Sequence, residues 1–133
     1  MALAMETIMA EIKQPLVLLI AEDDAAMRSL LCDELWDLKC RIVEARDGDE
    51  ALQLALESHP DLIITDLRMP AGGLDYLARL RTLVPDSPIV LMTAFGDAKT
   101  KDEAIRYGVA AYFDKPVRMA DLRRTIKELI ANC

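Results

Sequence analysis

The chain has 133 residues, 53% of them apolar and 29% charged, which is the balance of one globular domain rather than of a disordered segment. Its net charge of −7 argues against nucleic-acid contact by this domain, and no apolar run approaches the roughly 20 residues of a membrane helix. Three cysteines at no metal or redox spacing favour a reducing, cytoplasmic setting. We expect residues 1–14 to be an N-terminal extension without the basic start of a signal peptide, and residues 15–133 to form the domain.

Short apolar runs alternate with amphipathic segments from Leu16 onward. Residues 16–21 predict a buried strand, followed by a helix from about Ala25 that Asp24 caps. Residues 41–45 predict an edge strand, and an Asp47–Glu50 capping box opens a second helix that ends at the His59–Pro60 pair. The residues expected on the buried faces of these two helices are Met27, Leu30, Leu31, Leu35 and Leu38 in the first, and Ala51, Leu52, Ala55 and Leu56 in the second.

The second half of the chain repeats this alternation. Residues 61–65, 89–92 and 110–113 predict three more strands. Between them lie a helix with Leu74, Leu77, Leu80 and Leu83 on one face, and a polar helix over 97–107 that Gly108 ends. A last helix carries Met119, Leu122, Ile126, Leu129 and Ile130. Five strands alternating with five helices predict an α/β fold, a doubly wound parallel sheet covered on both faces.

Polar residues stand at the ends of four of the predicted strands. Glu22 and Asp23 come after the first, Asp66 after the third, Thr93 after the fourth and Lys115 after the fifth. The carboxyl ends of parallel strands meet at one edge of a sheet, where such folds bind ligands. Like charges ~4 Å apart repel by roughly 4 kcal/mol at an effective dielectric constant of ~20, so the cluster needs a cation. Oxygen ligands suit Mg²⁺ (or Mn²⁺), and a carboxylate beside a metal, an ammonium and a hydroxyl is arranged for phosphoryl transfer onto Asp66.

Each residue alone has a plainer interpretation. Acidic residues after a strand often cap the next helix, a strand-end aspartate is usually a turn residue, and a lysine before a proline can be a solvated loop residue. The phosphoryl-transfer interpretation depends on all of them sharing one edge of the sheet.

Four segments make the chain recognisable: 17–24, 61–70, 89–94 and 112–116. In their order and spacing they resemble the receiver domain of two-component response regulators, over nearly all of residues 16–130. The resemblance implies a flavodoxin-like sheet in the order 2-1-3-4-5. It also implies regulation by a phosphoryl group rather than catalysis on external substrates.

Site roles follow from the resemblance position by position. Asp66 is similar to the phosphoacceptor, Asp23 to the direct metal ligand and Glu22 to a ligand acting through water, with the Arg68 backbone carbonyl as a further ligand. The resemblance implies that Lys115 and Thr93 contact the phosphoryl oxygens. It also implies a cis bond before Pro116, and a switch pair of Thr93 and Tyr112.

One departure from the family pattern lies in the loop after Asp66. Only two residues stand between Pro70 and Gly73, where the family usually has three, and the acidic residue common there is missing. An enzyme of the haloacid dehalogenase type is the alternative, but it needs a second aspartate where Arg68 stands. A flavin or nucleotide binder is a third option, although no glycine-rich phosphate loop follows the first strand.

Partners are also implied by the resemblance. A sensor histidine kinase or a phosphotransfer protein is expected as phosphodonor. The surface of the fourth helix, fifth strand and fifth helix is expected to change on phosphorylation and to control an output domain or a partner. That surface carries both signs of charge, and we leave open whether it forms a homodimer or is merely solvated. No membrane contact is expected.

Overall fold

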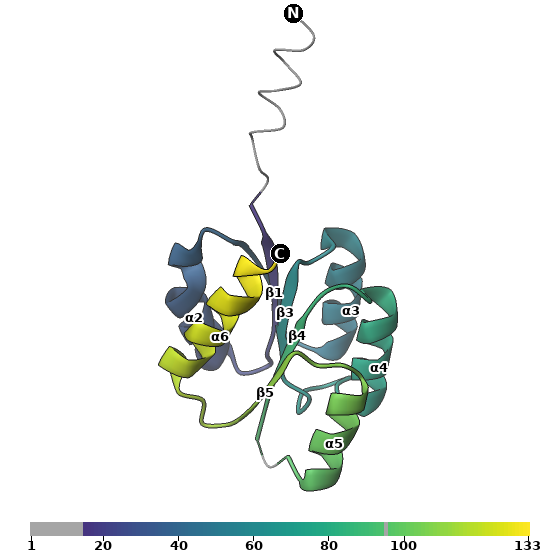
Figure 1. Ribbon diagram of the computed structural model, residues 1–133. Helices are drawn as coiled ribbons and strands as arrows, with labels where there is room; N and C mark the ends of the chain where they lie inside the picture. Colours follow the sequence, from purple (N-terminus) through teal and green to yellow (C-terminus); the bar gives the residue numbers. More distant parts are fainter. Residues whose placement is uncertain (1–14, 95) are drawn as a thin grey trace, which may run out of the picture.

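The computed structural model describes residues 15–94 and 96–133, so the predicted extension 1–14 lies outside the described part of the chain. Figure 1 shows a central sheet with helices on both faces. The elements, in chain order, are β1 (Val17–Ala21), α2 (Ala25–Leu35), the 3₁₀ turn η1 (Trp36–Leu38), β2 (Arg41–Ala45), α3 (Gly48–Ser58), β3 (Leu62–Thr65), α4 (Leu74–Leu83), β4 (Ile89–Thr93), α5 (Ala98–Arg106), β5 (Ala111–Asp114) and α6 (Met119–Ala131).

The sheet is parallel throughout and has the order β2-β1-β3-β4-β5, which confirms the predicted fold. The register aligns the strand ends, because Ala21 pairs with both Ala45 and Thr65, and Thr93 pairs with Asp114. The polar residues just after β1, β3 and β5, and Thr93 as the last residue of β4, therefore lie at the same edge.

Alternate residues of each strand point to opposite faces of the sheet and pack into two separate hydrophobic cores. Leu18, Ile20 and Ile64 pack against α2 and α6, whereas Leu19 and Ile63 pack against α3, α4 and α5. Figure 1 shows the same division, with α2 and α6 on one face and the other three helices opposite. The central strands β1, β3 and β4 are buried on both faces, as their unbroken apolar runs require.

Helix starts and stops largely follow the sequence. Asp24 caps α2, and Asp47 caps α3 by accepting a hydrogen bond from the Glu50 N–H at 2.8 Å. The Glu50 carboxylate reaches the Arg46 N–H at 3.1 Å, one residue earlier than in a regular capping box. His59 ends α3 in the left-handed conformation, and the bond before Pro116 is cis, as the resemblance implied.

The helix faces are narrower than predicted. Leu30, Leu56 and Leu83 were expected to be buried but are 47%, 59% and 41% exposed. All three lie at the margin of their apolar stripe, where the neighbouring elements do not cover them. None of the helices in the described ranges is long and apolar enough to cross a membrane.

Candidate functional site

Glu22, the first residue of the acidic pair at the end of β1, is held through its main chain. The Glu22 N–H donates to the Ala45 carbonyl on β2 at 3.0 Å, and the Glu22 carbonyl accepts from Arg28 Nη1 at 2.7 Å. Asp24 does not join the cluster, because its Oδ1 accepts from the first N–H groups of α2, at Ala26 and Met27. The loop thus presents the Glu22 and Asp23 side chains to the sheet edge while Asp24 caps the helix.

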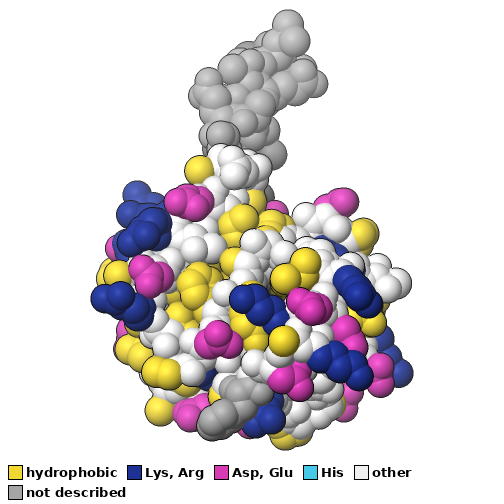
Figure 2. Space-filling view, turned by 60° about the horizontal axis from the view of Figure 1, so that its bottom comes forward, with side chains coloured by type: hydrophobic (Ala, Val, Ile, Leu, Met, Phe, Trp, Pro, Cys, Tyr) yellow, Lys and Arg dark blue, Asp and Glu magenta, His cyan; other side chains and the backbone are white. Residues whose placement is uncertain are grey.

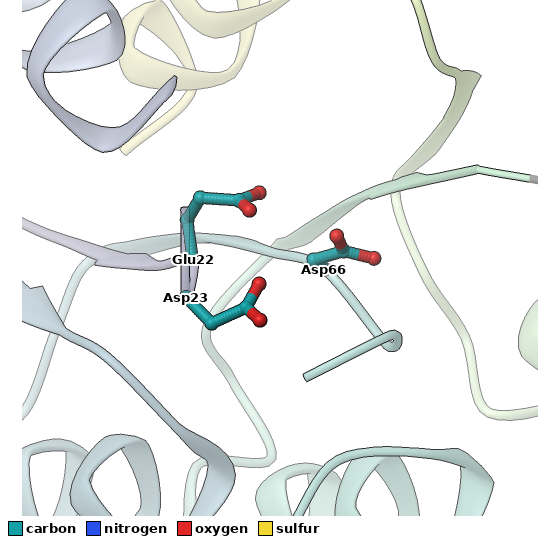
Figure 3. A group of neighbouring side chains, drawn as sticks. All are labelled: Glu22, Asp23 and Asp66. Carbon is teal, nitrogen blue, oxygen red and sulfur yellow. The ribbon is translucent and has the colours of Figure 1, made fainter. Parts of the chain in front are cut away.

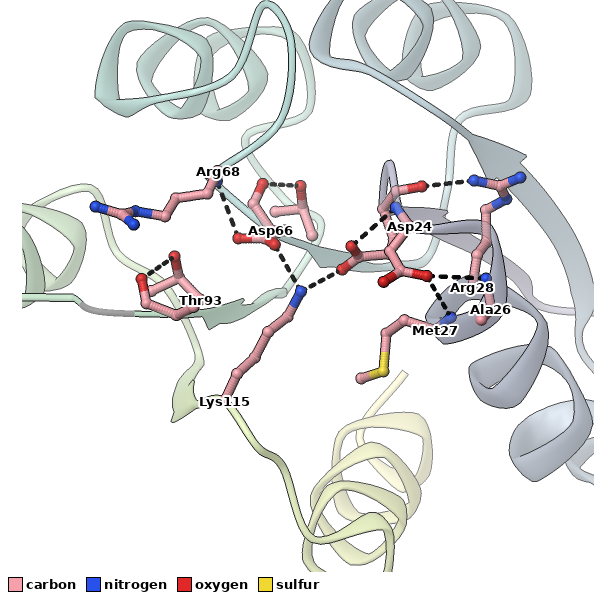
Figure 4. A network of polar contacts seen from close by, with 11 residues as sticks. Asp24, Ala26, Met27, Arg28, Asp66, Arg68, Thr93 and Lys115 are labelled. Atoms are coloured by element: carbon pink, nitrogen blue, oxygen red, sulfur yellow. Dashed lines mark hydrogen bonds and ion pairs between the residues drawn. The ribbon is translucent and has the colours of Figure 1, made fainter.

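Asp66 is 2% exposed and is fixed at its main chain and at both side-chain oxygens. Its N–H donates to the Ala21 carbonyl at 3.0 Å across the sheet. Oδ1 accepts from the Arg68 N–H at 2.9 Å, and Oδ2 accepts from Lys115 Nζ at 2.7 Å. Figure 4 shows this carboxylate between Arg68 and Lys115. The carboxylate is therefore pre-oriented by groups from two different loops.

Lys115 joins the two buried carboxylates, because Nζ also donates to Glu22 Oε2 at 2.7 Å. Burial raises the pKa of Glu22, and the hydrogen bond from Lys115 only partly offsets that effect. For Lys115, burial acts to lower the pKa, but the hydrogen bonds to Asp66 and Glu22 outweigh it and raise the pKa. The ammonium form of Lys115 is therefore the form that this site stabilises.

The donor set fits a divalent cation. Carboxylate oxygens of Glu22, Asp23 and Asp66 lie within 4.8 Å of one another, and Figure 3 shows the three side chains beside each other at two neighbouring strand ends. When all three are ionised, their negative charges outnumber the single positive charge of Lys115, and a divalent cation would balance the excess. Asp23 is exposed, so an ion bound here keeps access to water, as Mg²⁺ requires.

Figure 4 shows Thr93 beside the acceptor, but within the described residues neither Thr93 nor Tyr112 has a hydrogen bond to Asp66. Thr93 is 2% exposed, and its hydroxyl donates to the Ala94 carbonyl at 3.5 Å, so its single proton is not directed at Asp66. The Tyr112 hydroxyl is buried without a hydrogen-bond partner in the described part of the chain. A Cβ atom at Gly96 would lie 1.8 Å from that hydroxyl and 3.1 Å from the Thr93 methyl, so all three residues meet in one place.

A small hollow of about 230 Å³ separates these residues from the loop after β3. Its lining includes Arg68, Thr93 and Gly96. In Figure 4 the Arg68 side chain extends along this side of Asp66, away from Lys115. Figure 2 shows this end of the molecule, where acidic, basic and apolar side chains are intermingled without a large patch of one charge.

The shortened loop after the acceptor is anchored to the start of α3. The Gly48 N–H donates to the Pro70 carbonyl at 2.8 Å, and a Cβ at Gly48 would lie 1.8 Å from the Ala71 carbonyl oxygen. Ala71 and Gly73 both have positive φ, 57° and 95°. The loop therefore turns sharply enough to reach α4 with one residue fewer, and it leaves Asp66 in contact with its partners.

Sequence reasoning missed Arg28. Its Nη1 holds the Glu22 carbonyl and its Nε lies 3.2 Å from Glu44 Oε1 on β2, with the side chain only 14% exposed. A signal was present, because a cation near the positive N-terminus of a helix is unfavourable and needs a compensating partner. The compensating partners are the Glu22 backbone carbonyl and the Glu44 carboxylate on β2. Two further missed residues, Thr65 and Tyr76, lie behind the acceptor.

These features define an α/β domain that gathers carboxylates and one lysine at the strand ends of a doubly wound sheet. The family model of the response regulator receiver domain matches residues 18–127. The chain belongs to the response regulator receiver domain family, a family of regulatory domains.

Named relatives agree with this assignment. The chain is 36% identical over 112 residues to the regulatory protein LuxO of Vibrio cholerae, covering 84% of this chain and 25% of that protein. It is 38% identical over 115 residues to the transcriptional regulatory protein PdtaR of Mycobacterium tuberculosis, covering 85% and 56%. It is 31% identical over 116 residues to the phosphate regulon transcriptional regulatory protein PhoB of Escherichia coli, and the match covers 85% of this chain and 51% of PhoB. The chain thus spans between a quarter and just over half of these relatives.

Solved structures show the same fold. The N-terminal domain of an uncharacterised Wolinella succinogenes protein superposes with a TM-score of 0.82 at 32% identity, covering 88% of this chain and 95% of that one. A CheY-like receiver domain from Methanospirillum hungatei gives a TM-score of 0.84 at 23% identity, covering 90% and 96%. The latter likeness concerns the fold alone.

Proposed function

We propose that this receiver domain accepts a phosphoryl group on Asp66 from a histidine kinase or a phosphotransfer protein. The observation that carries the proposal is the geometry of Asp66: a buried carboxylate with Lys115 Nζ at 2.7 Å and the carboxylates of Glu22 and Asp23 alongside. In the reaction an Asp66 oxygen forms a bond to phosphorus while the phosphorus–nitrogen bond of a phosphohistidine breaks. The product is an aspartyl phosphate.

Glu22, Asp23, Asp66 and the Arg68 carbonyl are the proposed Mg²⁺ ligands. The ion supplies charge neutralisation for the phosphoryl oxygens. Lys115 contributes a positive charge already held at the acceptor, so little reorganisation is needed when negative charge arrives. The Arg68 N–H keeps Oδ1 in place. Thr93, at the end of β4, is proposed to become a donor to the phosphoryl group after its side chain turns away from the Ala94 carbonyl.

The proposed output is a change at the surface of α5, β5 and α6. The Tyr112 hydroxyl supports this, because beside Gly96 it makes no hydrogen bond within the described residues that would oppose a turn of the ring toward solvent. A movement of Thr93 toward the phosphoryl group would vacate space beside the ring. We propose that a partner, an output domain or a second copy of the chain recognises the changed surface, in a cytoplasmic setting.

The test is adduct formation with Mg²⁺ and either acetyl phosphate or beryllofluoride, measured by intact mass and by fluorine NMR. We expect one adduct on the wild-type chain and none on Asp66→Ala. Asp75→Ala removes an exposed carboxylate from the first turn of α4 and serves as the matched control, which should react like the wild type. An adduct that persists in Asp66→Ala, or a wild type that forms none, refutes the proposal.

A haloacid dehalogenase-type phosphatase is the second candidate, and the side chain at position 68 argues against it. A guanidinium stays protonated at neutral pH and cannot act as the general acid and base that hydrolysis of external phosphate esters needs.

A further inference from the structure

A chain of buried hydroxyl groups lies directly behind the acceptor. Thr65 is the last residue of β3, is fully buried, and places its Oγ1 2.9 Å from the backbone carbonyl oxygen of Asp66. Tyr76 in the first turn of α4 is 2% exposed, and its hydroxyl lies 2.8 Å from the same Oγ1. The two side chains thus connect the helix after the acceptor to the acceptor's own main chain.

The direction of both hydrogen bonds follows from the number of protons. The Asp66 carbonyl has none to give, so Thr65 must donate its only proton to it. The Thr65 oxygen can then only accept from Tyr76. Burial raises the pKa of Tyr76 to about 12, although the hydrogen bond to Thr65 acts in the opposite direction. The phenol therefore keeps its proton at any ordinary pH, and the relay runs from Tyr76 through Thr65 to Asp66.

This relay joins α4 to the acceptor without passing through the shortened loop. The cap of α4 is Gly73, which has no side chain to bond the first turn of the helix. The loop itself is closed by backbone bonds, such as that from the Gly73 N–H to the Leu67 carbonyl at 2.9 Å. The side chain of Tyr76 provides a second connection, and it ends on Asp66 itself.

We propose that Thr65 and Tyr76 are positioning residues for phosphorylation of Asp66, an inference that rests on the proposed function. Their relay fixes the plane of the peptide that follows Asp66. That peptide leads to the Arg68 N–H, which holds Oδ1 at 2.9 Å while Lys115 holds Oδ2. Without the relay the carbonyl can rotate, and the carboxylate spends less time between the ammonium and the cation site.

The experiment compares Thr65→Val, Thr65→Ser and Tyr76→Phe in the full chain. The rate of adduct formation with acetyl phosphate and Mg²⁺ is measured beside the free energy of unfolding in urea. A lost neutral hydrogen bond corresponds to a factor of roughly three to ten in rate, and we expect Thr65→Val to slow the reaction by that factor. Thr65→Ser keeps the hydroxyl and should recover most of the rate. Tyr76→Phe should be intermediate, and the double variant Thr65→Val/Tyr76→Phe no slower than Thr65→Val alone.

Two matched controls separate positioning from stability. Thr82→Val removes an exposed hydrogen bond between a hydroxyl and a backbone carbonyl in α4, the helix that carries Tyr76. Val84→Ala shortens a buried side chain at the C-terminal end of the same helix. If Thr65→Val reacts no more slowly than a control of equal stability, or if Thr65→Ser is as slow as Thr65→Val, the proposal is wrong. The comparison of Thr65→Val with Thr65→Ser decides between these outcomes even if Tyr76→Phe fails to fold. A wild type that forms no adduct would instead remove the proposed function, and this inference with it.

Discussion

At the scale of single residues, Lys115 stabilises two buried carboxylates at once. Its Nζ lies 2.7 Å from both Glu22 and Asp66, and its side chain is 20% exposed. A buried charge that loses its partner is costly, because neither water nor another cation replaces it. We expect Lys115→Met to lower the free energy of unfolding by about 2 kcal/mol in metal-free buffer at neutral pH, below the 3–5 kcal/mol of a fully buried pair.

The same variant should show a characteristic pH dependence. Burial already raises the pKa of Glu22, and loss of the ammonium raises it further. A carboxyl group with a raised folded-state pKa binds its proton more tightly in the folded chain, so the folded state gains stability as the pH falls through that pKa toward the ordinary value. Urea unfolding at pH 7.5 and pH 5 should therefore show that Lys115→Met lowers the free energy of unfolding, relative to the wild type, by less at pH 5 than at pH 7.5. Lys127→Met, on the exposed face of α6, is the control, and an equal loss at both pH values would contradict the argument.

The residues of the site differ in how far the sequence predicts them. Glu22, Asp23, Asp66 and Lys115 each follow a recognisable strand, so the parallel sheet alone brings them together. Tyr76 gives no such signal, because an aromatic residue in an apolar helix stripe is expected in the core whether or not its hydroxyl has a partner. Its contact with Thr65 depends on how closely α4 approaches β3, which no local pattern encodes.

At the scale of elements, the start of α3 and the loop after β3 constrain each other. Helix propensity alone favours alanine over glycine by up to about 1 kcal/mol at a helical position. At Gly48 the added Cβ would overlap the Ala71 carbonyl oxygen and carbon, at 1.8 and 2.5 Å, and backbone atoms cannot turn aside as a side chain can. Overpacking of this kind costs about 1–3 kcal/mol, so we expect Gly48→Ala to destabilise the domain despite its propensity.

Urea unfolding measures this effect, and Gln53→Ala is its control. Gln53 is exposed in the same helix, so its replacement should change stability by less than about 0.5 kcal/mol. Gly48→Ala should also slow adduct formation, because the displaced loop carries the Arg68 N–H. A Gly48→Ala chain as stable as the wild type would show that the loop moves away without cost.

The elements themselves were predictable where one local feature decides them. Unbroken apolar runs identified β1, β3 and β4, and the Asp24 and Asp47 caps identified two helix starts. Leu30, Leu56 and Leu83 were wrongly expected in the core, because periodicity gives the direction of a helix face but not the width that its neighbours cover. That width is decided by tertiary packing, as the margins of α2, α3 and α4 show.

At the scale of the whole molecule, the proposed cation site couples metal binding to global stability. Its carboxylates come from the ends of β1 and β3, which are adjacent central strands, and Lys115 comes from the end of β5. Unfolding separates these groups, so the unfolded chain has no preformed site. A ligand that binds only the folded state must then stabilise the entire domain.

We therefore expect Mg²⁺ at one hundred times its dissociation constant to raise the free energy of unfolding by about 2.7 kcal/mol, measured by urea unfolding with and without the ion. Asp23→Asn should lose most of this increment. In metal-free buffer the free energy of unfolding of Asp23→Asn should equal that of the wild type or exceed it by up to about 1 kcal/mol. The reason is that the substitution removes one like charge from an exposed position in the cluster. Asp24→Asn is the matched control, since asparagine also caps helices and Asp24 is bonded to α2 rather than to the cluster. It should keep the full increment. An equal Mg²⁺ effect in Asp23→Asn and the wild type would place the ion elsewhere on the domain.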